Sequence, residues 1–123
     1  MFLGMGAYAQ QQEVVVKITD LKKVSTVIQD ASTSSSNCGS SKFPVYQGTS
    51  ELNLEFSDLT WINVRHDLTP SDPNYVKIEV SFKDGKTEIY EMVRYIRFTG
   101  DTGEGNFAIM VKEINTIEVV QET

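Results

Sequence analysis

The chain has 123 residues with a formal net charge of −6, and 40% of them are hydrophobic and 23% charged. This length fits one domain with its own core, and the composition is that of a globular protein rather than a disordered one. The eleven Lys and Arg residues are spread along the chain. Because clustered positive charge is what draws in nucleic acid or an anionic membrane, we expect neither as a partner.

Residues 1–9 have the character of the end of a signal peptide. Ala7-Tyr8-Ala9 is a small-x-small pattern followed by Gln10, as at a signal peptidase site. The apolar stretch before it is too short to span a membrane. We therefore predict a signal-peptide remnant at residues 1–9, whose true start lies upstream, and a mature domain at residues 10–123 in the periplasm or outside the cell. An ordinary chain start is the alternative.

The only cysteine is Cys38, so no internal disulfide can form. It lies in "SSSNCGSS", a run of small polar residues typical of a loop. We interpret it as an incidental loop residue, with a reactive or intermolecularly paired thiol as the alternative.

Strand signals follow along the chain. The first region, "LKKVSTVIQ" at residues 21–29, fits a strand through its β-branched residues, although its apolar spacing also allows a short helix. The clearest element is "NYVKIEVSFK", where Val76, Ile78, Val80 and Phe82 alternate with polar residues. Asp84-Gly85 follows and favours a two-residue turn, so residues 75–93 are predicted to form a hairpin. Two more strands are expected after it, with a one-turn polar step between them at residues 112–116.

The apolar pattern occurs twice. Residues 52–64 align with residues 107–119 at an offset of 107 − 52 = 55, and all six apolar positions of the first segment meet apolar residues in the second. Further upstream, Asp20 aligns with Asp84 at an offset of 64, which puts Leu21 in the place of Gly85. The nine-residue difference fits an insertion in "ASTSSSNCGSS". We therefore predict two copies, residues 13–64 and 75–121, joined by a linker at residues 65–74.

The fold expected from this pattern is all-β. An isolated meander of this length leaves one apolar face bare, so the two pseudo-repeated antiparallel β-meanders should pack together as one β-sandwich or barrel.

The second copy resembles SH3-like and Sm-like small β-barrels in two features. Asp84-Gly85 stands where those barrels have an acidic-Gly turn before a bent strand, and "VKEINTIEV" matches the one-turn step before their last strand. Sm-like proteins bind RNA through an Asn and basic loop residues that have no counterparts here, so that function is not carried over. The whole chain also resembles short exported proteins of unknown function from Gram-negative bacteria.

Few residues suggest catalysis or metal binding. His66 is the only histidine, and we expect it to be exposed at a strand end rather than paired with Cys38, because a Ser/Gly loop cannot hold a nucleophile firmly. A zinc site would need more N or S ligands. "GDTGEGN" at residues 100–106 is interpreted as a hairpin connection, with a weak calcium site at Asp101, Glu104 and Asn106 as the alternative.

The function expected is that of a non-enzymatic exported binding or structural module without a cofactor, which meets a protein or a glycan. Its candidate contact residues are Trp61, Tyr90, Tyr95 and Arg97, since Trp, Tyr and Arg favour contact surfaces. Of these, Tyr90, Tyr95 and Arg97 are expected on the polar face of the second sheet. Trp61 is placed in the polar step of the first copy, either plugging the core or facing a partner. The alternative function is a small hydrolase in which at least two of His66, Asp67, Asp72, Asp101 and Glu104 converge on one pocket.

Overall fold

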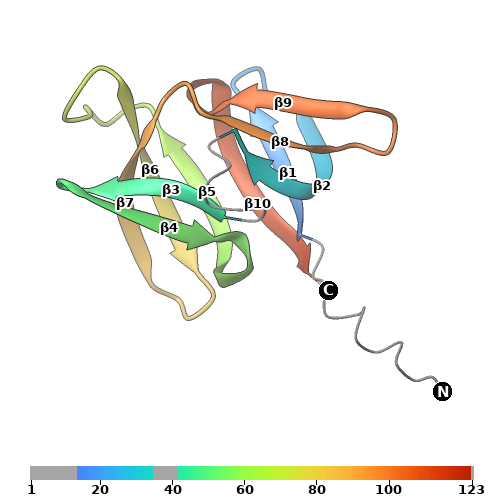
Figure 1. The fold of residues 1–123 in the computed structure, drawn as a ribbon, viewed down its shortest axis with the longest axis horizontal. Helices are drawn as coiled ribbons and strands as arrows, with labels where there is room; N and C mark the ends of the chain where they lie inside the picture. Colours follow the sequence, from blue (N-terminus) through green and yellow to red (C-terminus); the bar gives the residue numbers. More distant parts are fainter. Residues whose placement is uncertain (1–13, 35–41, 123) are drawn as a thin grey trace.

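The computed structural model describes residues 14–34 and 42–122, and it confirms the all-β fold (Figure 1). Cys38 and the predicted signal remnant lie outside the described residues. Ten antiparallel strands form one sheet in the order β4-β3-β7-β6-β5-β10-β1-β2-β8-β9. The strands are β1 (Val14–Asp20), β2 (Ser25–Thr33), β3 (Lys42–Gln47), β4 (Ser50–Glu55), β5 (Leu59–Arg65), β6 (Tyr75–Phe82), β7 (Thr87–Val93), β8 (Arg97–Asp101), β9 (Asn106–Met110) and β10 (Ile114–Glu122).

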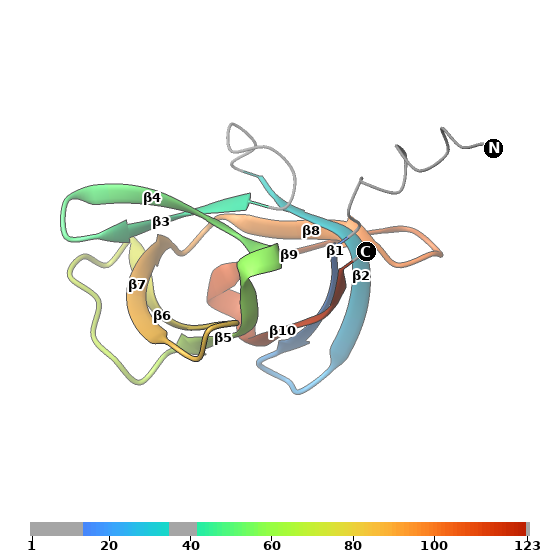
Figure 2. The same ribbon diagram turned by 90° about the horizontal axis from the view of Figure 1, so that it is seen from below.

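The sheet curls into a half-barrel. In Figure 2 the six central strands form a curved trough, and the two outer hairpins, β3–β4 and β8–β9, lie across its open side. The outer hairpins meet through aromatic rings: the ring centroids of Phe43 and Phe98 are 5.7 Å apart, and both rings contact Phe56. All three side chains are buried. The core therefore lies inside the curl and is closed by its two ends.

Period-two patterns explain which face of each strand turns inward. Val76, Ile78 and Val80 of β6 are buried, whereas Tyr75, Lys77 and Glu79 between them are half-buried and lie on the outer face. A residue-by-residue alternation of this kind is what a strand with one core face requires.

The strands of the two chain halves are interleaved. We call residues 14–65 the N-terminal half and residues 75–122 the C-terminal half. β2 of the N-terminal half pairs with β8, and β7 of the C-terminal half pairs with β3. At the centre, β5 pairs with β10, with Ile62 opposite Ile117. The sequence predicted that each half would build its own meander and that the meanders would pack as a sandwich or barrel. In the structure the halves join edge to edge in one curled sheet, and the first hairpin of each half pairs with the second hairpin of the other half.

The two halves share one pairing register. Phe43 pairs with Leu54 in β3–β4, and Phe98 pairs with Ile109 in β8–β9, which relates the hairpins by 109 − 54 = 55 residues. Val16 pairs with Ile28 in β1–β2 as Ile78 pairs with Tyr90 in β6–β7, a difference of 90 − 28 = 62 residues. We call residues related by these two offsets equivalent positions. The offset of 64 predicted for the first hairpin is therefore wrong by two residues.

The error of two residues appears in the first hairpin turns. The amide of Lys23 donates to the carbonyl of Asp20 and that of Gly85 to the carbonyl of Phe82, each at 3.0 Å. Both residues have positive φ, 68° and 94°. Lys23, not Leu21, thus stands in the place of Gly85. The predicted two-residue turn is also wrong, because residues 83–86 separate β6 from β7 and only Gly85 among them has positive φ.

Two further expectations concern local structure. Residues 25–33 form β2 after a turn at residues 21–24, so the helical alternative for residues 21–29 is wrong. The one-turn steps are short 3-10 helices, Phe56–Asp58 and Val111–Glu113, which confirms a step before the last strand of each half. Trp61 lies beyond the first step, on β5, half-buried on the face opposite the buried Ile62. It therefore does not plug the core.

Candidate functional site

A pocket of about 480 Å³ lies where β6, β7 and the β3–β4 turn approach the linker. Its size is within the range of small-ligand sites. It is lined by Tyr46, Gln47, Gly48, Thr49, Ser71, Lys77, Ile89, Tyr90 and Glu91, and we call it the aromatic pocket. The ring of Tyr46 also packs on that of Tyr75, with centroids 5.5 Å apart. The pocket thus combines flat apolar surfaces with amide, ammonium and carboxylate groups.

Glu91 is held in place by the linker. The hydroxyl of Ser71 donates to one carboxylate oxygen and the amide of Ser71 to the other, each at 2.6 Å. A carboxylate that accepts two such bonds still has lone pairs for further donors. Glu91 is therefore oriented in advance to accept hydrogen bonds from a ligand hydroxyl or amine.

Tyr90 is only 8% exposed and belongs to the core. Burial raises the pKa of its phenol, and the charge of Glu88 adds to the effect. Its hydroxyl accordingly stays protonated, and the side chain packs in the core while Ile89 and Glu91 on either side of it line the pocket. The sequence placed Tyr90 on a polar sheet face; this placement is wrong, because its position on β7 alternates with outer-face residues Ile89 and Glu91.

A second pocket of about 250 Å³ lies on the other side of Tyr75. It is lined by His66, Leu68, Pro70, Pro73, Tyr75, Val76, Arg94 and Lys112, and we call it the basic pocket. Its three ionisable groups other than the tyrosine are all basic. The side chain of His66 is fixed there by a 2.8 Å hydrogen bond between Nε2 and the carbonyl of Ile114. Because a carbonyl only accepts, Nε2 carries the proton and Nδ1 is the nitrogen left for other contacts.

A third pocket, of about 450 Å³, lies between β2 and the β8–β9 hairpin and is lined in part by Asp30, Asp101 and Asn106. Asp30 has positive φ, 55°. Of the predicted calcium ligands, Asp101 and Asn106 line this pocket and Glu104 does not; Asp101 accepts the amide of Gly103 at 2.9 Å. No cluster of three or more His, Cys, Asp or Glu side chains suited to a metal occurs in the described residues.

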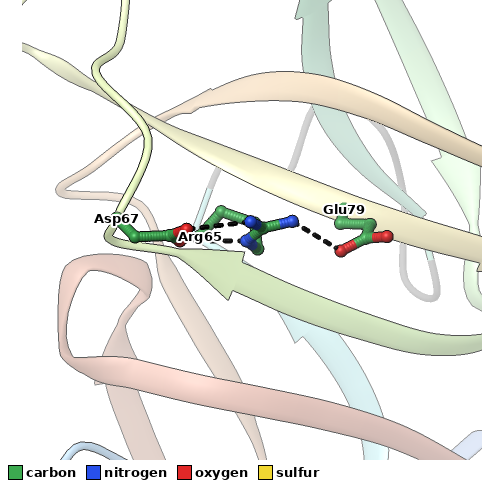
Figure 3. Close-up of polar contacts among 3 residues, drawn as sticks. All are labelled: Arg65, Asp67 and Glu79. Atoms are coloured by element: carbon green, nitrogen blue, oxygen red, sulfur yellow. Dashed lines mark hydrogen bonds and ion pairs between the residues drawn. The ribbon is translucent and has the colours of Figure 1, made fainter.

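An ion-pair chain lies where β5 enters the linker (Figure 3). The guanidinium of Arg65 donates two hydrogen bonds to Asp67, at 2.8 and 2.9 Å, and one to Glu79 at 3.0 Å. The bidentate contact lowers the pKa of Asp67 from 3.8 to about 2. The carboxylates of Asp67 and Glu79 in turn raise the pKa of Arg65. Asp67 is thereby engaged in holding the linker.

The candidate contact residues do not gather in one place. Tyr90 lines the aromatic pocket, whereas Trp61 lies on the outer face of β5. Tyr95 is 52% exposed in the turn between β7 and β8, and Arg97 is exposed at the start of β8. Of the five residues proposed for a hydrolase, His66 and Asp101 line different pockets.

Sequence reasoning missed the residues that give the two linker pockets their chemistry: Tyr46, Lys77, Glu91, Arg94 and Lys112. A signal for some of them exists in the register of the halves. The positions equivalent to Tyr46, Lys77 and Glu91 hold Asp101, Val15 and Gln29. These pocket side chains are therefore not required by the shared strand pairing, although for Lys77 and Glu91 only the correct offset of 62 reveals this.

The fold and its pockets define a class: a small all-β half-barrel with two hollows flanking one linker. None of the described residues forms a helix long and apolar enough to cross a membrane. A family model described as "Uncharacterised protein" matches residues 10–122, so the chain belongs to that family. No curated protein and no solved structure matches it. The resemblance to SH3-like and Sm-like barrels stays a prediction.

Proposed function

We propose that the protein is a non-enzymatic binding module that holds a glycan in the aromatic pocket. A sugar ring has an apolar face that packs on aromatic rings and a rim of hydroxyls that needs donors and acceptors. The aromatic pocket offers both, through Tyr46 on one hand and Gln47, Lys77 and Glu91 on the other. The observation that carries the proposal is the orientation of Glu91 by two hydrogen bonds from Ser71.

Orientation in advance matters because binding otherwise costs side-chain freedom. Each rotamer-rich side chain that a ligand immobilises costs about 0.5–1.5 kcal/mol. Glu91 is already tied to the linker, and Tyr46 already packs on Tyr75. Two of the polar and aromatic contacts are therefore in place before a ligand arrives.

Titration calorimetry of the purified full chain against a panel of neutral and acidic hexasaccharides tests the proposal. We expect at least one member to bind, and Tyr46→Ala to weaken its binding by about tenfold or more, which corresponds to 1.4 kcal/mol. Asp101→Ala is the matched control, since Asp101 is the equivalent position in the other half and lies in a different pocket. Equal loss in both variants, or binding of a protein partner alone through Trp61, contradicts the glycan proposal.

Export is part of the proposed function and has the periplasm or the cell exterior as its destination. Its support is the small-x-small pattern at Ala7-Tyr8-Ala9. The family match, residues 10–122, includes none of the nine residues assigned to the signal. The mass of the exported product tests it, and cleavage far from Ala9 would exclude this signal.

We also infer that the two halves are copies of one ancestral unit. The support is the shared pairing register, which extends to the turn bonds of Lys23 and Gly85. Relatives whose two halves are more similar to each other in sequence than the halves of this chain would strengthen the inference. Relatives in which only one half has this pairing register would contradict it.

The hydrolase alternative has one observation in its favour. Two carboxylates, those of Asp30 and Asp101, line the same pocket, and Asp30 has a strained backbone of the kind that occurs at functional sites. If the protein releases reducing sugar from the same hexasaccharides and Asp101→Asn abolishes this release, the protein is a hydrolase and the binding-module proposal is wrong.

A further inference from the structure

We propose that the basic pocket receives an oxyanion, a carboxylate or a phosphate group, of the ligand whose sugar part occupies the aromatic pocket. The inference rests on the proposed glycan-binding function and adds the charge of the ligand to it. It identifies the ligand class as an acidic saccharide.

All charged side chains around the basic pocket are cationic, although the protein has a net charge of −6. Three other pockets lined by described residues each include a carboxylate: Asp30 and Asp101 in one, Glu91 in the aromatic pocket, and Asp58 and Asp84 in a fourth. An acidic protein as a whole repels an anionic ligand. The basic pocket, by contrast, is lined by cationic side chains and by no carboxylate.

The two permanent cations are brought together by the backbone. The amide of Lys112 donates to the carbonyl of Arg94 at 3.1 Å. Both side chains lie over one aromatic ring, with the Arg94 guanidinium carbon 5.4 Å and the Lys112 ammonium 5.6 Å from the centroid of Tyr95. An oxyanion that enters the basic pocket therefore meets two cationic side chains whose backbones are hydrogen-bonded to each other.

Neither cation is well neutralised within the described residues. Lys112 has one ion pair, a 3.7 Å contact with the exposed Glu113, and such surface pairs contribute little. Arg94 donates one hydrogen bond, at 3.3 Å, to the carbonyl of Pro73. Since a guanidinium has five N–H donors, most of its capacity remains for an oxyanion.

The two linker pockets adjoin each other. Tyr75 lines the basic pocket, and its ring packs on Tyr46 of the aromatic pocket. Linker residues line both, with Ser71 on one side and Pro70 and Pro73 on the other. A saccharide that lies along the Tyr46–Tyr75 pair therefore places a substituent of a neighbouring unit in the basic pocket, whose smaller volume of about 250 Å³ suits a single charged group.

The test uses the full chain and three probes: hexagalacturonate, neutral cellohexaose and inorganic phosphate. The variant is Arg94→Gln/Lys112→Gln, and the matched control is Lys22→Gln/Lys23→Gln, which removes the same charge from the exposed β1–β2 turn. We expect hexagalacturonate to bind more tightly than cellohexaose, with an affinity that falls as salt is added. The pocket variant should lower uronate affinity by about tenfold or more and leave cellohexaose affinity unchanged.

The outcomes separate this inference from the proposed function. Equal uronate affinity in the pocket variant and the control overturns the anion site while glycan binding stands. Phosphate binding that disappears in the pocket variant, without binding of either saccharide, supports the anion site and rejects the glycan. Absence of binding of all three probes overturns both.

Discussion

The two halves of the chain have the same strand register but different side chains at the surface of their pockets. The β3–β4 and β8–β9 hairpins pair identically, and so do β1–β2 and β6–β7. Where the C-terminal half has Tyr90 and Glu91, the N-terminal half has Ile28 and Gln29. The same strand pairing is thus compatible with either set of side chains. Side chains that the halves share specify the half-barrel, and those that differ are free to serve a function.

The buried rings of the two outer hairpins offer the strongest test of what the halves share. Phe43 and Phe98 occupy equivalent positions and pack against each other. We expect Phe43→Ala and Phe98→Ala each to lower the free energy of unfolding by about 3–5 kcal/mol, through lost burial and a cavity. Urea denaturation followed by fluorescence measures both. If one variant is tolerated and the other is not, the two ends do not contribute equally to the closure.

Gly100 and Val45 occupy equivalent positions whose requirements differ. A Cβ on Gly100 would lie 2.7 and 2.8 Å from side-chain atoms of Ile28 and 2.9 Å from the carbonyl oxygen of Gln29. We expect Gly100→Ala to destabilise by about 1–3 kcal/mol.

A second substitution identifies the cause at Gly100. Ile28→Val removes the nearest methyl group, so Gly100→Ala should cost less in that background, although the contacts with the Cβ of residue 28 and the backbone of Gln29 persist. Gly105→Ala, where a Cβ meets nothing within 4 Å, is the control. Similar losses in Gly100→Ala and Gly105→Ala would show that close approach is not the reason for glycine at position 100.

The first hairpin turns allow a reciprocal test at equivalent positions. Gly85→Ala places a Cβ at φ 94° with nothing nearby to contact, so we expect a loss of about 1–2 kcal/mol from backbone strain alone. Lys23→Gly relieves the same strain at φ 68° but adds freedom to the unfolded chain. The net gain should be about 0.5 kcal/mol. Thermal unfolding of both variants measures the pair, and a loss in Lys23→Gly would contradict it.

Much of this fold was predictable because apolar alternation follows the strands. The hairpin of residues 75–93 and the 55-residue correspondence between Leu54 and Ile109 follow from periodicity alone. The first hairpin was misaligned because Asp20 and Asp84, although both aspartates, occupy different positions in their turns. The positive φ of Lys23, which marks the correct alignment, cannot be recognised from the sequence.

The exchange of hairpins and the pockets were beyond the sequence for physical reasons. Period-two patterning indicates which face of a strand is buried, but not which strand is its neighbour in the sheet. The β2–β8 and β3–β7 pairs could therefore not be predicted. The pockets depend on those pairs: Tyr46 reaches Tyr75 only because β3 lies beside β7. Arg94 and Lys112, distant in sequence, meet through a backbone bond between the end of β7 and the 3-10 helix at Val111–Glu113.

The ion-pair chain at the linker should have the smallest effect, and it is specific to one half. Asp67 is exposed, and its pKa of about 2 lies below its ordinary value of 3.8 because Arg65 donates two hydrogen bonds to it. A depressed pKa in the folded state adds stability that is complete above about pH 4 and is lost as the pH falls towards 2. Asp67→Asn should therefore flatten the decline of unfolding free energy across this window, while Asp67→Asn in an Arg65→Gln background should change nothing further. Parallel pH profiles for the wild type and Asp67→Asn would mean that the Arg65–Asp67 contact does not form in solution. The orientation of Ser71 toward Glu91 would then depend on other linker contacts, such as the bond between the Asp72 carboxylate and the amide of Asn74.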